Sequence, residues 1–174
     1  MTIEFRNVCK TFGTKAVLKG LDLKVETGEV MFVIGTSGVG KSVTIKHLIG
    51  LLRADTGEML LDGQEVQDLS EKAYYPIRQK CAMVFQSSTL FDSLSVLENV
   101  ILPLRKHQRI SPQQCRDKAL DLLAKVGMSD FAQRFPAELG DGMRKRVAIA
   151  RALTMEPRYV LFDEPTTGLD PVSA

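Results

Sequence analysis

The chain has 174 residues, which is enough for one domain that buries a sizeable core. Hydrophobic residues make up 44% and charged residues 25%, the proportions expected of a soluble globular fold. The net charge of +2 is too small to indicate a nucleic-acid partner, and we expect none.

The cysteines and the N-terminal residues indicate the cellular compartment of the protein. Cys9, Cys81 and Cys115 lack metal-ligand spacing, and their odd number favours a reduced, cytosolic compartment. The first ten residues lack the long apolar run of a signal peptide, and no apolar stretch is long enough to span a bilayer. We therefore expect that any role at a membrane depends on a partner or a surface contact.

The first predicted elements are strands. Ile3, Phe5 and Val8 lead to a turn, and residues 21–25 then alternate apolar and polar side chains, which predicts a half-buried strand. Residues 30–34 are a continuous apolar run of strand length, typical of a buried parallel strand. A glycine-rich loop follows, and then a helix over about residues 41–51.

Strand and helix patterns alternate along the rest of the chain. Residues 57–61 and 81–85 predict strands, and residues 142–155 predict a helix that Pro157 stops. Ser111 and Gln114 have the spacing of a capping box, with the helix continuing to Gly127. Residues 159–162 predict a last buried strand. This alternation indicates an α/β layered fold with a mostly parallel central sheet.

The glycine-rich loop matches the pattern G-x-x-x-x-G-K-[ST] at every fixed position. Its glycines let successive backbone N–H groups point at phosphate oxygens, and the N-terminus of the following helix favours anions. An accidental match is disfavoured, because a strand pattern precedes the loop and a helix pattern follows it. Lys41 can reach the β- and γ-phosphates, and the Ser42 hydroxyl can bind Mg²⁺. The predicted nucleotide-binding residues here are Gly35, Thr36, Ser37, Gly38, Val39, Gly40, Lys41, Ser42 and Val43.

The last predicted strand ends in two carboxylates, Asp163 and Glu164. Ligands of open α/β sheets bind outside the carboxyl ends of the strands. Asp163 is therefore a candidate Mg²⁺ ligand, and Glu164 is a candidate group for polarising an attacking water. Taken alone, the pair is also what a strand that ends in solvent would show.

Nearly the whole chain resembles ATP-binding cassette (ABC) domains, because five motifs occur in their order. Besides the phosphate loop and the acidic strand end, Phe12 matches an adenine-stacking aromatic loop, and Gln86 matches the glutamine loop that contacts Mg²⁺ or water. Residues 138–153 resemble the signature and its helix, and residues 163–171 resemble the acidic strand end together with the D-loop, counted as one motif.

The resemblance implies a P-loop NTPase three-layer fold with an N-terminal antiparallel β portion and a helical subdomain at about residues 87–155. It implies ATP and Mg²⁺ as cofactors, and ATP hydrolysis with Glu164, Lys41 and Gln86 as catalytic residues. A second cassette subunit would pair head to tail and contact the nucleotide through Gly140, Gly142 and Asp170. The domain would lie peripherally on the inner face of the cell membrane, bound to an integral membrane permease.

The signature departs from the family pattern Leu-Ser-Gly-Gly-Gln. Gly140 replaces the serine and Asp141 replaces the first glycine. A carboxylate near a γ-phosphate is repulsive, so we hypothesise a weakened half-site, unless Asp141 points away and backbone N–H groups still bind the phosphate. The basic residues of this stretch are interpreted as a solvated helix face: Arg144, Lys145, Arg146 and Arg151.

Two further features concern the C-terminus and the subfamily. The chain stops at Ala174, before the switch histidine that the family carries, so we expect an incomplete domain that hydrolyses ATP weakly or not at all. Residues 35–48 and 142–144, with Met143 in place of glutamine, resemble ATPases of the Mla type, which serve phospholipid transport with MCE-domain proteins.

Three alternatives stay open from the sequence. One is a cassette protein of DNA repair or translation control without a membrane partner. Another is a nucleotide-binding module that does not hydrolyse ATP, which the residues Gly140 and Asp141 suggest. The third is a small-molecule kinase that shares only the phosphate loop, but no acceptor site is recognisable.

Overall fold

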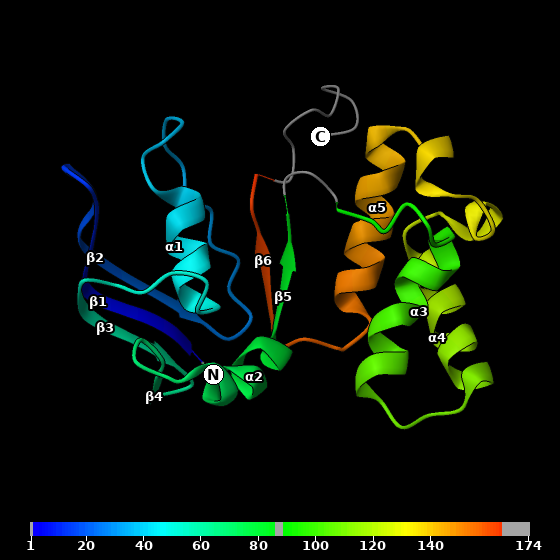
Figure 1. Cartoon of the computed structure of the whole chain (residues 1–174), viewed down its shortest axis with the longest axis horizontal. Helices are drawn as coiled ribbons and strands as arrows, with labels where there is room; N and C mark the ends of the chain where they lie inside the picture. Colours follow the sequence, from blue (N-terminus) through cyan, green and yellow to red (C-terminus); the bar gives the residue numbers. More distant parts are fainter. Residues whose placement is uncertain (1, 86–88, 165–174) are drawn as a thin grey trace. The chain divides into compact units, whose positions relative to one another are not determined.

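The computed structural model describes residues 2–85 and 89–164. The chain divides into two compact units, Met1–Arg78 and Gln79–Ala174 (Figure 1). The predicted site residues Gln86 and Asp170 lie outside the described residues. Within the described ranges, no helix has the length and apolar character that crossing a membrane requires.

The first unit is built on a four-stranded sheet of order β2-β1-β3-β4. Its strands are β1 (Thr2–Phe12), β2 (Lys15–Glu26), β3 (Thr56–Leu61) and β4 (Gln64–Glu65), all paired antiparallel. The expected antiparallel β portion is confirmed, as is the alternation over residues 21–25, where apolar side chains are half-buried and polar ones exposed. The buried side chains of this sheet include Phe5, Val8 and Met59.

Two helices accompany the sheet. Helix α1 (Lys41–Leu48) buries Leu48 and His47, and helix α2 (Glu71–Lys80) buries Tyr74 and Ile77. The sequence did not predict α2, because Pro76 stands inside it and its apolar positions are few. Arg78 at its end donates from Nε to the carbonyl oxygen of Ile49, 2.9 Å away, and so holds the end of α1.

The second unit combines a short parallel sheet with helices. Strands β5 (Cys81–Val84) and β6 (Tyr159–Phe162) pair in parallel, and the chain between them forms α3 (Val96–His107), α4 (Pro112–Lys125) and α5 (Asp141–Leu153) (Figure 1). Two short 3₁₀ turns, Ser129–Phe131 and Pro136–Glu138, connect α4 to α5. The helices share one apolar core, whose fully buried members include Val96, Val100, Leu104, Ala119, Leu123, Val147 and Ala150.

Capping boxes set the starts of two helices in this unit, α3 and α4. Ser111 and Gln114 exchange side-chain and backbone hydrogen bonds at the start of α4, as the sequence predicted. Ser95 and Glu98 do the same for α3, and this second box has the spacing that would have predicted the helix start from sequence.

Residues 30–34 do not form the strand that their apolar run predicted. They have no ladder partner among the described residues, and Phe32 and Ile34 are 82% and 92% exposed. A run of apolar side chains favours burial between neighbours, but a strand exists only where its N–H and C=O groups are paired. The strand at Tyr159–Phe162 is confirmed, but not its burial: Val160 and Phe162 are exposed, since β5 is the sole neighbour of β6 in the described sheet.

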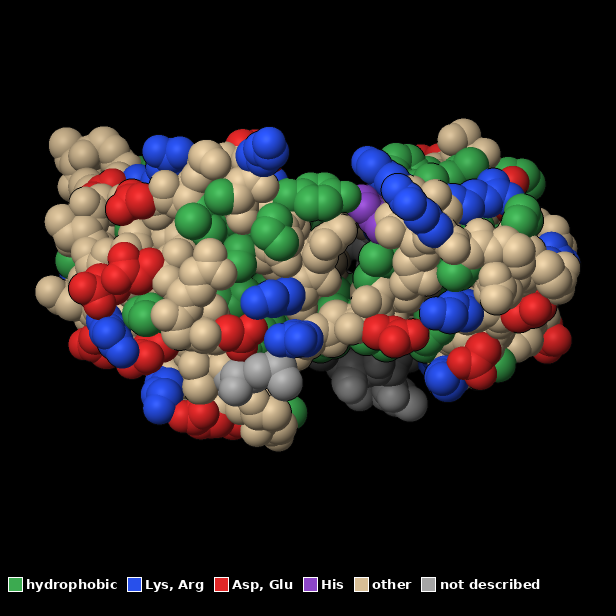
Figure 2. Space-filling model, turned by 90° about the horizontal axis from the view of Figure 1, so that it is seen from below, with side chains coloured by type: hydrophobic (Ala, Val, Ile, Leu, Met, Phe, Trp, Pro, Cys, Tyr) green, Lys and Arg blue, Asp and Glu red, His purple; other side chains and the backbone are tan. Residues whose placement is uncertain are grey.

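Charged side chains of both signs are interspersed on each unit over the face drawn in Figure 2. Many are paired locally. Arg6 contacts both Glu4 and Glu58, and Lys10 Nζ lies 2.7 Å from the carboxylate of Asp55. The surface therefore carries its charge as small compensated groups.

Candidate nucleotide-binding site

The phosphate loop is an exposed turn that leads directly into α1. Gly38 and Gly40 have left-handed φ values of 78° and 116°, which side chains rarely adopt. A β-carbon on Gly40 would also lie 3.0 Å from Val17 Cγ1. The glycines of the motif are thus required by the backbone path at these two positions.

Lys41 is folded back over the loop that it follows. Its Nζ donates to the carbonyl oxygens of Gly35 and Thr36, at 2.9 and 3.1 Å. Helix α1 begins at Lys41 with Gly40 as N-cap, without a side-chain cap and without an acidic residue in its first turn. The positive end of the helix dipole is therefore not compensated by a capping carboxylate.

Phe12 lies at the end of β1 and is 43% exposed, so it is not part of the core of the unit. The Nζ of Lys10 lies 5.5 Å from the centroid of its ring. The same ammonium pairs with Asp55, whose carboxylate also accepts from the Thr11 N–H at 2.7 Å. These two contacts hold the pKa of the Asp55 carboxyl below its usual value, with Lys10 as the larger cause.

The predicted carboxylates follow β6 in the second unit. Asp163 is 8% exposed, and its N–H donates to the carbonyl oxygen of Val84 at 3.0 Å, which continues the parallel ladder beyond the strand. Glu164 is half-buried in a left-handed conformation with φ 49°. The two carboxylates thus leave the carboxyl end of a strand, as predicted, while the phosphate loop belongs to the first unit.

The signature residues form the start of α5. Gly140 is the N-cap, in extended backbone without a side-chain cap, and Asp141 is the first helical residue. The Asp141 carboxylate forms an ion pair with Arg144, one turn along the helix. The sequence offered two alternatives, that Asp141 repels the γ-phosphate or that it points away. The ion pair differs from both, because the carboxylate stays at the helix start and Arg144 compensates its charge.

Sequence reasoning missed a polar network at the other end of α5. Arg151 donates to the carbonyl oxygen of Thr89 and to Asn99 Oδ1, and its guanidinium lies 5.7 Å from the centroid of the Phe91 ring. Burial lowers the pKa of Arg151. The interpretation of the basic residues as one solvated face is therefore wrong for Arg151 and for Lys145, which is 6% exposed, since the helix turns them toward the core.

Asn99 explains why this region is ordered. Its side-chain amide is fully buried and bonds the backbone of Phe91, Leu94 and Ser95. No sequence pattern predicts the contact between Arg151 and Asn99, because the two residues are 52 positions apart in the chain. A buried Asn inside an apolar helix face was the one available signal.

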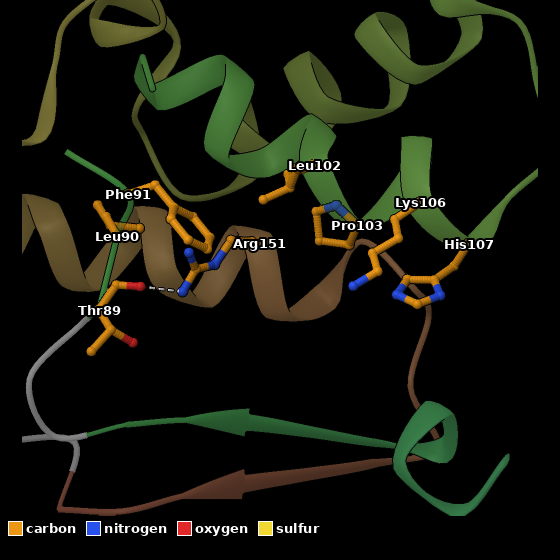
Figure 3. A pocket seen from close by; sticks show the side chains of 8 residues that line it. All are labelled: Thr89, Leu90, Phe91, Leu102, Pro103, Lys106, His107 and Arg151. Atoms are coloured by element: carbon orange, nitrogen blue, oxygen red, sulfur yellow. Dashed lines mark hydrogen bonds between the residues drawn. The ribbon is translucent and has the colours of Figure 1, made fainter. Parts of the chain in front are cut away.

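A pocket of about 340 Å³ opens beside this network (Figure 3). Phe91 and Arg151 lie close together at one end of it, and Lys106 and His107, at the C-terminal end of α3, lie at the other. The complete lining is Thr89, Leu90, Phe91, Leu102, Pro103, Lys106, His107 and Arg151. It combines apolar and basic side chains, and none of these residues is acidic.

Comparison with known proteins agrees with these features. The family model described as "ABC transporter" matches residues 18–167. The "Probable ribonucleotide transport ATP-binding protein mkl" of Mycobacterium tuberculosis is 40% identical over 99% of the chain, which spans 48% of that relative. The "Intermembrane phospholipid transport system ATP-binding protein MlaF" of Haemophilus influenzae is 37% identical over 98% of the chain, which spans 65% of it.

A solved structure gives the same result for the fold. The ATP-binding cassette MJ0796, in a dimer bound to ADP and Pi, matches with a TM-score of 0.89 and 35% identity, over 98% of this chain and 77% of that one. The chain spans about half the length of mkl, so the comparison covers one part of such a protein. The chain belongs to the ABC transporter family and has the P-loop NTPase fold of its ATP-binding cassettes.

Proposed function

We propose that this chain is the ATP-binding and ATP-hydrolysing part of an ABC transporter, peripheral on the cytoplasmic face of a membrane. The observation that carries the proposal is the phosphate loop. Its two left-handed glycines turn the backbone, and Lys41 and the uncompensated start of α1 add positive charge at the same place. Backbone amides, an ammonium and a helix N-terminus together suit the triphosphate of a nucleotide.

In this proposal the loop residues 35–43 wrap the phosphates with their N–H groups. Lys41 exchanges its present carbonyl partners, Gly35 and Thr36, for phosphate oxygens. Phe12 stacks on the adenine, which its exposed position permits. Affinity then rests mainly on the phosphates, and stacking on Phe12 adds to it with little discrimination between bases.

The Mg²⁺ ligands we propose are Ser42, Gln86 and Asp163. A hydroxyl, an amide oxygen and a carboxylate are the oxygen donors that Mg²⁺ prefers. In the part of the chain that the structure describes, no three His, Cys, Asp or Glu side chains come together as a metal cage. These residues therefore suit an ion held jointly with phosphate oxygens, and the ion supplies charge neutralisation when bound.

Glu164 is the proposed water-polarising residue, beside the metal ligand Asp163. Lys41 and Gln86 would complete the catalytic set through charge stabilisation and positioning. A second cassette subunit, head to tail, would supply Gly140, Gly142 and Asp170 to the same nucleotide. The dimer of MJ0796 bound to ADP and Pi supports the pairing of two cassettes.

ATP hydrolysis tests the proposal in the full-length protein. Glu164→Gln is expected to lower Mg²⁺-dependent turnover by about 100-fold or more while Mg·ATP binding persists, because the base is lost but the phosphate loop is kept. Glu156→Gln, an exposed carboxylate of the same unit, is the matched control. Wild-type turnover in Glu164→Gln would refute the assigned role.

We further propose that the pocket of Figure 3 receives a segment of an integral membrane permease. Its apolar lining and its basic residues suit an amphipathic segment, and cassette proteins of this family act with membrane subunits. Lys106→Glu is expected to reduce co-purification of the permease from membranes, without loss of Mg·ATP binding. Lys125→Glu, a charge reversal at an exposed position of α4, is the control; equal loss in both variants would count against the pocket.

For the transported molecule we propose a phospholipid, with an MCE-type protein as a further partner. The similarity to MlaF and the residue Met143 support this class. For the complete transporter in detergent, added phospholipid is expected to stimulate ATP hydrolysis several-fold, whereas a ribonucleotide other than ATP, the substrate class in the name of mkl, is not. Stimulation by the ribonucleotide alone would contradict the lipid proposal.

A further inference from the structure

An ion pair stands at the start of α5, where the sequence departs from the family pattern. Asp141, the first residue of the helix, pairs through its carboxylate with the guanidinium of Arg144. Residues three apart face the same side of a helix, so the pair needs no distortion of the backbone. The Arg144 N–H also donates to the carbonyl oxygen of Gly140, 2.9 Å away, so that one residue holds both the cap and the carboxylate.

The pair decides the net charge of this helix end. A lone carboxylate at the first helical position would take up the favourable interaction with the helix dipole and repel any second anion. With Arg144 beside it, the charges of the two side chains sum to zero. Gly140 adds no side chain, and a β-carbon there would meet nothing within 4 Å, so the approach to the backbone is open.

We infer that Arg144 is a positioning residue: it neutralises Asp141 and so lets the start of α5 face the triphosphate of a nucleotide held by a second cassette subunit. The inference rests on the proposed function, in which the signature of one subunit closes on the nucleotide of the other. A signature that contains a carboxylate can then still approach the triphosphate, because the charge of Asp141 is compensated by the Arg144 side chain of the same chain.

The pair contributes little to the folding of the unit itself. Its side chains are 71% exposed for Asp141 and 37% exposed for Arg144, and ion pairs at such positions add little to stability because water screens them. When two subunits close, the same charges lose water and interact more strongly. Removal of Arg144 therefore affects closure far more than folding.

The test measures Mg·ATP-dependent dimer formation by sedimentation velocity in the full-length protein with Glu164→Gln, which retains ATP. Arg144→Gln is expected to weaken dimer formation by about tenfold or more at low salt and by less at high salt, because salt screens the exposed repulsion. The double variant Asp141→Asn/Arg144→Gln is expected to recover to within about threefold of the parent, and Arg144→Lys to keep most of the affinity. The melting temperature should stay within about 2 °C in every variant.

Arg146→Gln, an exposed neighbour on the same helix, is the matched control and should leave the dimer unchanged. Equal dimer formation by the parent and Arg144→Gln would overturn this inference alone, as would a double variant no better than the single one. A parent that forms no dimer with Mg·ATP would overturn the proposed function and the inference together.

Discussion

At the scale of single residues, backbone geometry fixes several glycines more tightly than any motif indicates. Gly57, the second residue of β3, has φ 94°, and a β-carbon there would lie 2.5 Å from the carbonyl oxygen of Asn7 and 2.6 Å from Val8 Cα. Both contacts are backbone atoms of the neighbouring strand, which cannot move without breaking the sheet. The sequence shows only a glycine at the start of a strand pattern.

Gly57→Ala is expected to lower the free energy of unfolding by about 2–4 kcal/mol, from the strained φ together with the overlap. Gly63→Ala is the comparison, because φ there is 77° but nothing lies within 4 Å of the added carbon, and it should cost only about 1 kcal/mol. Urea unfolding of both variants checks this. Equal losses would show that the overlap at Gly57 is relieved.

Arg151 is the residue whose role was least accessible from sequence. Arg151→Ala removes the donor to the Thr89 carbonyl and to Asn99, and it removes the cation over the Phe91 ring. We expect a loss of about 2 kcal/mol in the free energy of unfolding, because two charge-assisted hydrogen bonds and the contact with the Phe91 ring are lost together. Arg146→Ala, on the exposed side of the same helix, should change it by less than about 0.5 kcal/mol.

The residues that the sequence predicted well are those whose signal is local. The phosphate-loop pattern spans eight consecutive positions, and the structure gives two of its glycines a left-handed backbone and turns its lysine over the loop. The Arg151–Asn99 contact joins distant positions and has no pattern of its own. Local motifs can therefore be read before folding, while contacts across the core cannot.

At the scale of elements, helix starts are governed by the capping boxes of α3 and α4. The Ser95 N–H donates to Glu98 Oε2 at 2.8 Å, and the Ser95 hydroxyl accepts from the Glu98 N–H at 3.2 Å. The Ser95 backbone contact is the main reason why the pKa of the Glu98 carboxyl lies below its usual value, with the Ser95 side chain as the second cause. The carboxylate is thus favoured in the folded chain.

This shift predicts a pH dependence. A carboxyl whose pKa is lower folded than unfolded stabilises the protein above its unfolded pKa, and this contribution is lost as the pH falls through the folded pKa. Glu98→Gln keeps the hydrogen-bonding shape but does not titrate. The variant should therefore lose less stability than the parent between about pH 6 and about pH 3, measured as urea midpoints. An identical loss in both would contradict the assignment.

Elements also show where a pattern alone misleads. The apolar run at residues 30–34 predicted a buried strand, whereas the described residues provide it with no partner strand and leave Phe32 82% exposed. The alternating pattern of β2 was sufficient to predict a strand, because its hairpin partner β1 is adjacent in the chain. Strand formation follows from pairing as well as from composition.

At the scale of the whole molecule, the order of motifs predicted the family and the fold correctly. The α/β composition and the antiparallel N-terminal portion were expected, and of the expected mostly parallel central sheet the described residues show the parallel pair β5–β6. The division into units of residues Met1–Arg78 and Gln79–Ala174 was not expected, since no linker composition marks residue 78. The expected helical subdomain at about residues 87–155 remains a proposal.

Binding of a nucleoside triphosphate by the phosphate loop of the first unit underlies the whole proposed function. Isothermal titration of Mg·ATP into full-length Lys41→Ala measures this binding, with circular dichroism to confirm folding and Lys46→Ala, on the last turn of α1, as control. We predict that Lys41→Ala weakens Mg·ATP binding by about tenfold or more, because the ammonium that lies over the loop is lost, while Lys46→Ala binds as the parent does. Unchanged Mg·ATP affinity in a folded Lys41→Ala protein would contradict the account.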